Sequence, residues 1–180
     1  QLFATYSSIK SLLLVCFVWA SFSFNFYLIG IDLKYLPGDL YRNSLASGFA
    51  DIIGMASSGY LIQKLSAKET LKLFFLIAGF SGLILMFSSG FSYLFLFLSR
   101  GCICSTGNIM FYLTVSMFRP SVSATAMGLC NVVSRLLTMA APVVVEFHEP
   151  TPLTIYTFMC FAAVICVLAL NEIQDEEEKP

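Results

Sequence analysis

Six long apolar segments constrain this 180-residue chain more than any other feature of its sequence. A helix of about 20 apolar residues spans the hydrocarbon core of a bilayer. The segments are near that length, and short stretches rich in Pro, Gly or charged residues separate most of them. The sequence therefore predicts six transmembrane helices, at residues 11–31, 41–62, 71–89, 91–115, 121–146 and 152–170.

The composition agrees with a membrane protein. The chain is 58% hydrophobic and 12% charged, whereas soluble domains carry about 25% charged residues. Its net charge of −1 argues against a nucleic-acid partner, because such partners require a basic face. We expect an all-α integral membrane protein with a lead-in at residues 1–10, a helical body at 11–170 and an acidic, solvated tail at 171–180.

The basic residues of the loops predict the orientation of the chain. Lys and Arg accumulate in cytoplasmic loops. With both ends on one side, that side carries Lys10, Lys64, Lys68, Lys72, Arg119 and Lys179, and the opposite side carries only Lys34 and Arg42. We therefore expect both ends of the chain to be cytoplasmic.

The sequence gives little support for enzyme activity or metal binding. The chain has a single histidine, His148, and its six cysteines lie inside apolar segments, where we interpret them as small buried residues. Neither a nucleophile elbow nor a phosphate-binding glycine loop is present, and Asp51 has no second intramembrane aspartate. We expect no enzyme activity, no metal and no cofactor.

Three charges lie near the middle of predicted spans: Asp51 in the second, Arg100 in the fourth and Arg135 in the fifth. A charge at the centre of a lone membrane helix costs roughly 2.5–3.5 kcal/mol on insertion scales. We therefore expect all three to face the interior of the bundle or a water-filled cavity.

Small and polar residues recur at helical spacing around each of these charges. They are Ser44, Ser47, Gly54 and Ser58 around Asp51; Cys104, Gly107 and Asn108 around Arg100; and Gly128, Asn131 and Thr138 around Arg135. Two interpretations remain open. Either the small residues pack helices together and Asp51 forms a structural ion pair with one arginine, or the arginines line a hydrated cavity and hold an anionic substrate. Two arginines against one carboxylate leave a surplus positive charge.

Several stretches resemble the carboxy-terminal half of an organic ion transporter of the major facilitator superfamily, in its organic anion/cation (solute carrier) branch. They are similar to the family's seventh, eighth, tenth and eleventh helices in turn: "VWASFSFNFYLIGIDL" (18–33), "NSLASGFADIIG" (43–54), "LSRGCICSTGNIMFY" (98–112) and "TAMGLCNVVSRLLTMAAP" (125–142). Matching single residues are Trp19, Tyr27, Asp32, Asp51, Arg100, Asn108 and Pro142.

The resemblance implies a fold and a substrate class. It implies one six-helix half-bundle made of two inverted three-helix repeats. At the position of Arg135, members of the family that carry organic anions tend to have arginine, and those that carry cations tend to have aspartate. We therefore expect organic anions as substrates and the plasma membrane, rather than an organelle, as the location. The candidate substrate-binding residues are Arg135, Arg100, Asp51, Tyr27, Asn108 and Asn131.

Aromatic residues supply further candidates for an amphipathic pocket, which in the family stacks on hydrophobic ions. They are Trp19, Phe24, Phe26, Tyr27, Phe111 and Tyr112. With 18 phenylalanines in the chain, many of them must simply face lipid or pack against neighbours.

The chain departs from the family where the family's cytoplasmic gate charges lie. Ser66, Ala67 and Lys68 stand in place of a Gly-Arg-Arg-type loop, and Ser116 and Ser123 stand in place of a glutamate and an arginine. These departures suggest a divergent gate or a protein that no longer transports.

The resemblance covers only half of a transporter, so the partner we expect is an amino-terminal six-helix half. The chain starts with Gln1, and three arrangements are open: a fragment of a longer carrier, a dimerising half, or a structural remnant. The expected function is transport of small organic ions through alternating access, and the arginine at position 135 favours organic anions among them. The alternative is a non-transporting structural subunit of a larger membrane assembly.

Overall fold

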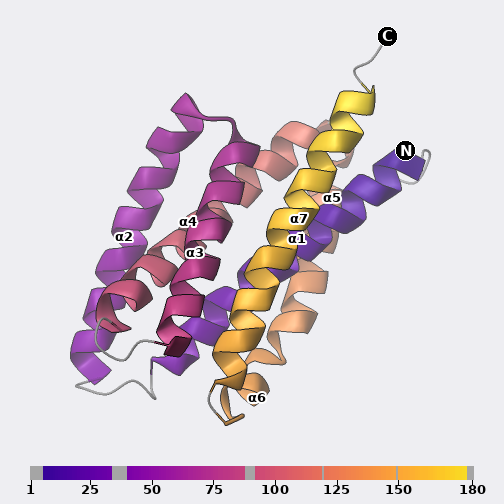
Figure 1. The fold of residues 1–180 in the computed structure, drawn as a ribbon. Helices are drawn as coiled ribbons and strands as arrows, with labels where there is room; N and C mark the ends of the chain where they lie inside the picture. Colours follow the sequence, from indigo (N-terminus) through magenta and orange to yellow (C-terminus); the bar gives the residue numbers. More distant parts are fainter. Residues whose placement is uncertain (1–5, 34–39, 88–91, 119, 149, 178–180) are drawn as a thin grey trace.

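The computed structural model describes residues 6–33, 40–87, 92–118, 120–148 and 150–177, and their regular structure is helical throughout. The helices, drawn in Figure 1, are α1 (Tyr6–Asp32), α2 (Leu40–Lys64), α3 (Ala67–Phe87), α4 (Ser92–Met117), α5 (Pro120–Thr138), α6 (Ala141–Val145) and α7 (Thr151–Glu177). Six stretches in them are long and apolar enough to cross a membrane. The prediction of an all-α protein with six membrane-spanning helices is confirmed.

The fifth predicted span is interrupted in the structure. Instead of one helix over 121–146, α5 ends at Thr138, and the short α6 begins at Ala141 with a proline in its first turn. The proline is Pro142. A proline ring clashes with the carbonyl four residues earlier and has no N–H to donate, so the helix cannot continue unbroken past Thr138.

The acidic carboxy-terminal segment, which we expect to be a solvated tail, begins as helix in the structure. α7 continues as helix through the segment after Leu170 and ends at Glu177. The part of α7 that is apolar enough to cross a membrane nevertheless ends at Leu170, the residue at which the predicted span ends.

The helices pack as two interlocked sets of three. The first set is α1, α2 and α3, and the second is α4, α5 and α7. α1 packs against α5 and α7, and α4 packs against α2 and α3. α1 also contacts α4. Exchanging α1, α2 and α3 for α4, α5 and α7 therefore preserves the principal contacts. This is the arrangement of one major-facilitator half-bundle built from two three-helix repeats.

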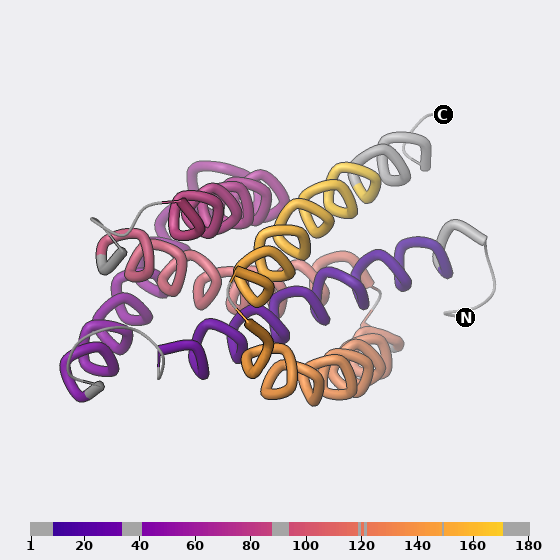
Figure 2. Tube along the Cα trace, turned by 60° about the horizontal axis from the view of Figure 1, so that its bottom comes forward, coloured from indigo at the N-terminus to yellow at the C-terminus, as the bar shows by residue number. Residues whose placement is uncertain are grey.

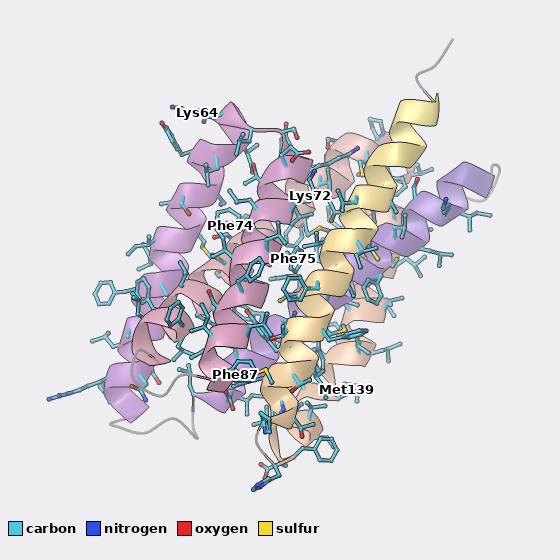
Figure 3. The ribbon with its side chains drawn as sticks, in the orientation of Figure 1. Lys64, Lys72, Phe74, Phe75, Phe87 and Met139 are labelled. Atoms are coloured by element: carbon cyan, nitrogen blue, oxygen red, sulfur yellow. The ribbon has the colours of Figure 1, made fainter. Side chains whose placement is uncertain are left out.

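Both ends of the helical body lie at the same end of the bundle. In Figure 1, the start of α1 and the end of α7 lie at the top of the view. Figure 3 places Lys64, the last residue of α2, and Lys72, near the start of α3, at that same end. These two lysines therefore lie at the end of the bundle that holds both ends of the helical body.

α1 and α4 form the centre of the bundle, and α2 and α5 lie at its flanks. In their most apolar stretches, 67% of the α1 residues and 61% of the α4 residues are buried, against 17% for α2 and 22% for α5. Figure 2 shows α2 (purple) and α5 (orange) at separate edges, with α1 passing between them. α2 and α5 thus present extensive apolar surface that the described residues leave exposed.

Candidate functional site

An ion pair joins α2 to α4 at the middle of the bundle. Arg100 Nε donates to Asp51 Oδ1 at 3.0 Å, and Arg100 Nη2 donates to Asp51 Oδ2 at 3.2 Å. This two-pronged geometry suits a guanidinium and a carboxylate. The Arg100 side chain is 11% exposed and that of Asp51 is 23% exposed, so both charges are largely withdrawn from the surface and neutralise each other.

Arg100 has further partners on α1. Its Nη1 donates to the Phe26 carbonyl oxygen at 2.8 Å, and its Cζ lies 3.9 Å from the centre of the Phe26 ring. A cation over an aromatic face gains favourable electrostatic energy. Arg100 therefore links three helices, α1, α2 and α4.

Glycines bring these helices close enough to form the pair. A Cβ atom at Gly54 would lie 2.2 Å from the Gly101 carbonyl oxygen, and one at Gly101 would lie 2.9 Å from the Ala50 carbonyl oxygen. Small residues permit such close approach of membrane helices. Because Ala50 and Gly101 directly adjoin Asp51 and Arg100, the crossing of α2 and α4 fixes the depth of the ion pair.

Arg135 has a different environment. It lies on α5 in an exposed position. Its Nη1 donates to Tyr27 Oη at 2.8 Å, and its Cζ lies 5.7 Å from the centre of the Tyr27 ring. A phenol carries no charge at neutral pH, so this contact orients Arg135 without neutralising it.

Arg135 borders a cleft between α1, α4 and α5. The cleft has a volume of about 180 Å³ and is lined by Trp19, Phe22, Ser23, Phe26, Tyr27, Phe111, Asn131, Ser134 and Arg135. Its wall is mostly aromatic, with hydroxyl, amide and guanidinium groups on the α5 side. It can hold a flat apolar group beside an anionic one.

The aromatic wall is a connected row of rings. Trp19 meets Phe111 edge to face at 4.7 Å between ring centres, and Phe26 meets Tyr27 edge to face at 5.6 Å. Phe22 lies between Trp19 and Phe26, 6.4 Å from the first ring and 6.1 Å from the second. Edge-to-face pairs at these distances are favourable. The Phe26–Tyr27 contact joins the surroundings of Arg100 to those of Arg135.

Hydrogen bonds between helices hold this wall in position. Trp19 Nε1 donates to Thr114 Oγ1 on α4 at 2.9 Å. Thr138 Oγ1 on α5 donates to Ser23 Oγ on α1 at 2.9 Å. The cleft is therefore braced on both sides of α1.

The six predicted site residues fall into three groups. Asp51 and Arg100 form the ion pair, and Arg135, Tyr27 and Asn131 all line the cleft. Asn108 is exposed on α4 and does not line the cleft. The structure also places Phe24, one of the further aromatic candidates, in the hydrophobic core at 4% exposure.

Three lining residues were missing from the predicted site: Phe22, Ser23 and Ser134. A signal for Phe22 was present, because Trp19, Phe22 and Phe26 recur at the i, i+3, i+7 spacing of one helix face. Ser23 and Ser134 give no such signal, since small hydroxyl residues are common at helix contacts.

The six cysteines are free thiols; five are buried and Cys166 is partly buried. Among the residues that the structure describes, no group of three or more His, Cys, Asp or Glu side chains is placed to hold a metal ion. The chemistry of the site is therefore built from charge, aromatic surface and hydrogen bonds.

Comparison with known proteins relates the chain to transporters at low identity. No protein-family model matches it. Similar proteins include the Synaptic vesicle 2-related protein of Xenopus laevis, 24% identical over 138 residues, which are 76% of this chain and 25% of the relative. Solute carrier family 22 member 6 of Bos taurus is 23% identical over 162 residues, which are 86% of this chain and 30% of the relative.

A third relative, Solute carrier family 22 member 6-A of Xenopus laevis, is 25% identical over 166 residues, which are 86% of this chain and 29% of the relative. The chain thus spans between 25% and 30% of the length of these relatives. Two of the three relatives are named as solute carriers, and the similarity supports transmembrane transport in general.

Proposed function

We propose that this chain forms part of a carrier that moves small organic anions across a membrane by alternating access, with Arg135 as the counter-charge for the substrate. The observation that carries this proposal is the environment of Arg135, which is exposed at mid-span, oriented by the neutral Tyr27 and bordered by an aromatic cleft. An unneutralised arginine at this depth marks a functional position by default.

The charge balance favours Arg135 over Arg100. Asp51 occupies two N–H groups of Arg100 and cancels its charge. Of the two intramembrane arginines, Arg135 is therefore the one whose charge Asp51 does not match. In this proposal Asp51 and Arg100 shape the pocket through Phe26, and Arg135 meets the ligand.

The cleft indicates the shape of the substrate. Its row of aromatic rings suits a flat apolar group, and Asn131 and Ser134 offer hydrogen-bonding groups next to Arg135. We infer an aromatic or otherwise flat carboxylate. Because the cleft is open on the flank of the bundle, we also propose that a second set of membrane helices completes it.

The loop charges and the family resemblance support a location for this carrier. Lys64 and Lys72, on either side of the connection between α2 and α3, lie at the end of the bundle that also holds the start of α1 and the end of α7. With the positive-inside rule, this arrangement favours cytoplasmic ends, and the resemblance favours the plasma membrane.

Uptake by the full-length protein in proteoliposomes tests the proposal. The probe is a radiolabelled aromatic carboxylate, and the variants are Arg135→Ala, Arg135→Lys and Arg135→Asp. We expect uptake to fall at least tenfold with Ala and Asp and to persist in part with Lys, which keeps the charge but not the planar fork. Arg42→Ala, at an exposed position of α2, is the control and should leave uptake unchanged. Equal loss in the control, or full uptake by Arg135→Ala, would contradict the assignment.

A structural subunit without transport activity is the second candidate. It is favoured by Ser66, which stands where the family has a gate residue. Here Ser66 Oγ accepts a hydrogen bond from the Glu69 backbone N–H at 3.3 Å, as helix-capping serines do. Absence of uptake for every ion tested, together with stoichiometric purification of the full-length protein in a larger membrane complex, would support this candidate instead.

A further inference from the structure

A small cavity lies between α2 and α4, beside the ion pair but apart from the aromatic cleft. Its volume is about 30 Å³, and it is lined by Asn43, Ala46, Ser47, Leu96, Phe97 and Arg100. Asn43 belongs to the first turn of α2. The cavity therefore connects the end of the bundle at which α2 begins with the guanidinium of Arg100.

Asn43 has an unmet hydrogen-bonding group at this cavity. The residue is 6% exposed, and its Nδ2 has no hydrogen-bond partner among the residues that the structure describes. Leaving a buried donor unpaired is unfavourable, because the group has lost its hydrogen bonds to bulk water and gained none in return. Buried polar groups without a protein partner are commonly satisfied by an ordered water.

Arg100 and Ser47 supply further polar groups to the same cavity. The described hydrogen bonds of Arg100 use three of its N–H groups, and a guanidinium has five. Ser47 is 9% exposed, and its hydroxyl can donate or accept. Three polar side chains thus border a cavity large enough for one water, which needs about 10–15 Å³ and two to four partners.

We propose that this cavity is a binding site for a single ordered water, which accepts from Asn43 Nδ2 and from a free N–H of Arg100 and donates to Ser47 Oγ. Charge favours water over an anion. The positive charge of Arg100 is already matched by Asp51 at 3.0 Å, so an anion in the cavity would be a buried charge without a counter-charge.

The water gives Asn43 a role as a positioning residue. The water links the first turn of α2 to an N–H group of Arg100 that does not donate to Asp51. Since Arg100 lies against the Phe26 ring, which also lines the aromatic cleft, its position sets part of the cleft wall. This inference concerns the α2–α4 cavity and does not depend on the substrate proposed above.

Radiolytic hydroxyl labelling of the full-length protein in ¹⁸O water tests the site, because radicals formed from a bound water modify the side chains that touch it. Leu96 lines the cavity and is 7% exposed, and Leu33 does not line it and is 8% exposed. We expect Leu96 to be labelled at least fivefold faster than Leu33. Asn43→Leu, which fills the cavity, should abolish the difference, and Asn43→Ser should retain part of it.

Equal labelling of Leu96 and Leu33 in the wild type would overturn the proposal, as would unchanged Leu96 labelling in Asn43→Leu. If Asn43→Leu does not fold, the wild-type comparison and Asn43→Ser still decide. A crystal of the full-length protein soaked in bromide adds a separate arm. Anomalous density for bromide in the cavity would overturn the assignment to water, and its absence there would support it.

Discussion

At the scale of single residues, the two intramembrane arginines differ in what neutralises them. Arg100 is 11% exposed and carries a carboxylate, a carbonyl and an aromatic ring as partners. Arg135 is exposed, and its hydrogen-bond partner is the phenol oxygen of Tyr27. The same type of side chain is thus largely buried in an ion pair at position 100 and exposed at position 135.

Breaking the ion pair should destabilise the protein strongly. Asp51→Asn leaves the Arg100 guanidinium without its counter-charge, and removing one partner of a buried pair costs about 3–5 kcal/mol. We expect a large fall in the thermal unfolding temperature of the full-length protein in detergent. The double variant Asp51→Asn/Arg100→Gln should recover part of this loss, because no uncompensated charge remains. Additive losses in the double variant would contradict the pairing.

The three intramembrane charges are evident in the sequence, but their pairing is not. Asp51, Arg100 and Arg135 all fall near mid-span, so depth alone leaves both arginines available to the carboxylate. The choice depends on the crossing of α2 and α4 at Gly54 and Gly101, which is a long-range contact without a local signal. The cleft was likewise predictable only in part, since Tyr27 and Asn131 stood out but Ser23 and Ser134 did not.

At the scale of helices, the crossing of α2 and α4 depends on the absence of a side chain at Gly54. We expect Gly54→Val to destabilise the protein by about 1–3 kcal/mol or more, as overpacking a tight contact does, because its Cβ would lie 2.2 Å from the Gly101 carbonyl oxygen. The matched control is Gly48→Val on the same helix, where nothing lies within 4 Å of an added Cβ. Thermal unfolding of the two variants should separate them, and equal shifts would refute the close crossing.

The contact between α1 and α5 can be tested through its cysteines. Cys16 Sγ and Cys130 Sγ lie 3.1 Å apart, near enough for an oxidant to join them with small movements. We expect a copper–phenanthroline oxidant to form this disulfide in the full-length protein, detected by mass spectrometry of digested peptides. Cys16→Ala should remove the cross-linked peptide. Cross-links from Cys16 to other cysteines would show that the two helices have a different register.

The sequence contains the local chemistry of one helix boundary that the predicted spans do not include. Pro142 breaks the fifth predicted span for a reason contained in its own ring, although the length of the apolar run suggested one helix. The extension of α7 to Glu177 has no comparable signal, because acidic residues are acceptable both in an exposed helix and in a solvated tail.

At the scale of the whole molecule, α2 and α5 lie at the flanks of the bundle and are largely exposed. Arg135 shares its exposed surface on α5 with Val132 and Met139, which line the same shallow recess. If this surface faced lipid, a charge would lie against hydrocarbon at a cost of a few kcal/mol. The chain spans at most 30% of the relatives described above, and we propose that further membrane helices, those of an amino-terminal six-helix half, enclose this surface.

Spin labels in the full-length protein test this arrangement. Labels at Val132→Cys and Met139→Cys flank Arg135, and a control label at Ile165→Cys lies on α7, where Ile165 is 66% exposed. Oxygen concentrates in the hydrocarbon, whereas a polar nickel chelate reports water. We expect the two α5 labels to show low oxygen accessibility. The nickel chelate should reach them wherever they border a hydrated cavity. The Ile165 label should show high oxygen accessibility. High oxygen accessibility at all three positions would mean that α5 faces lipid, and the charge of Arg135 would then need a different neighbour from the one proposed here.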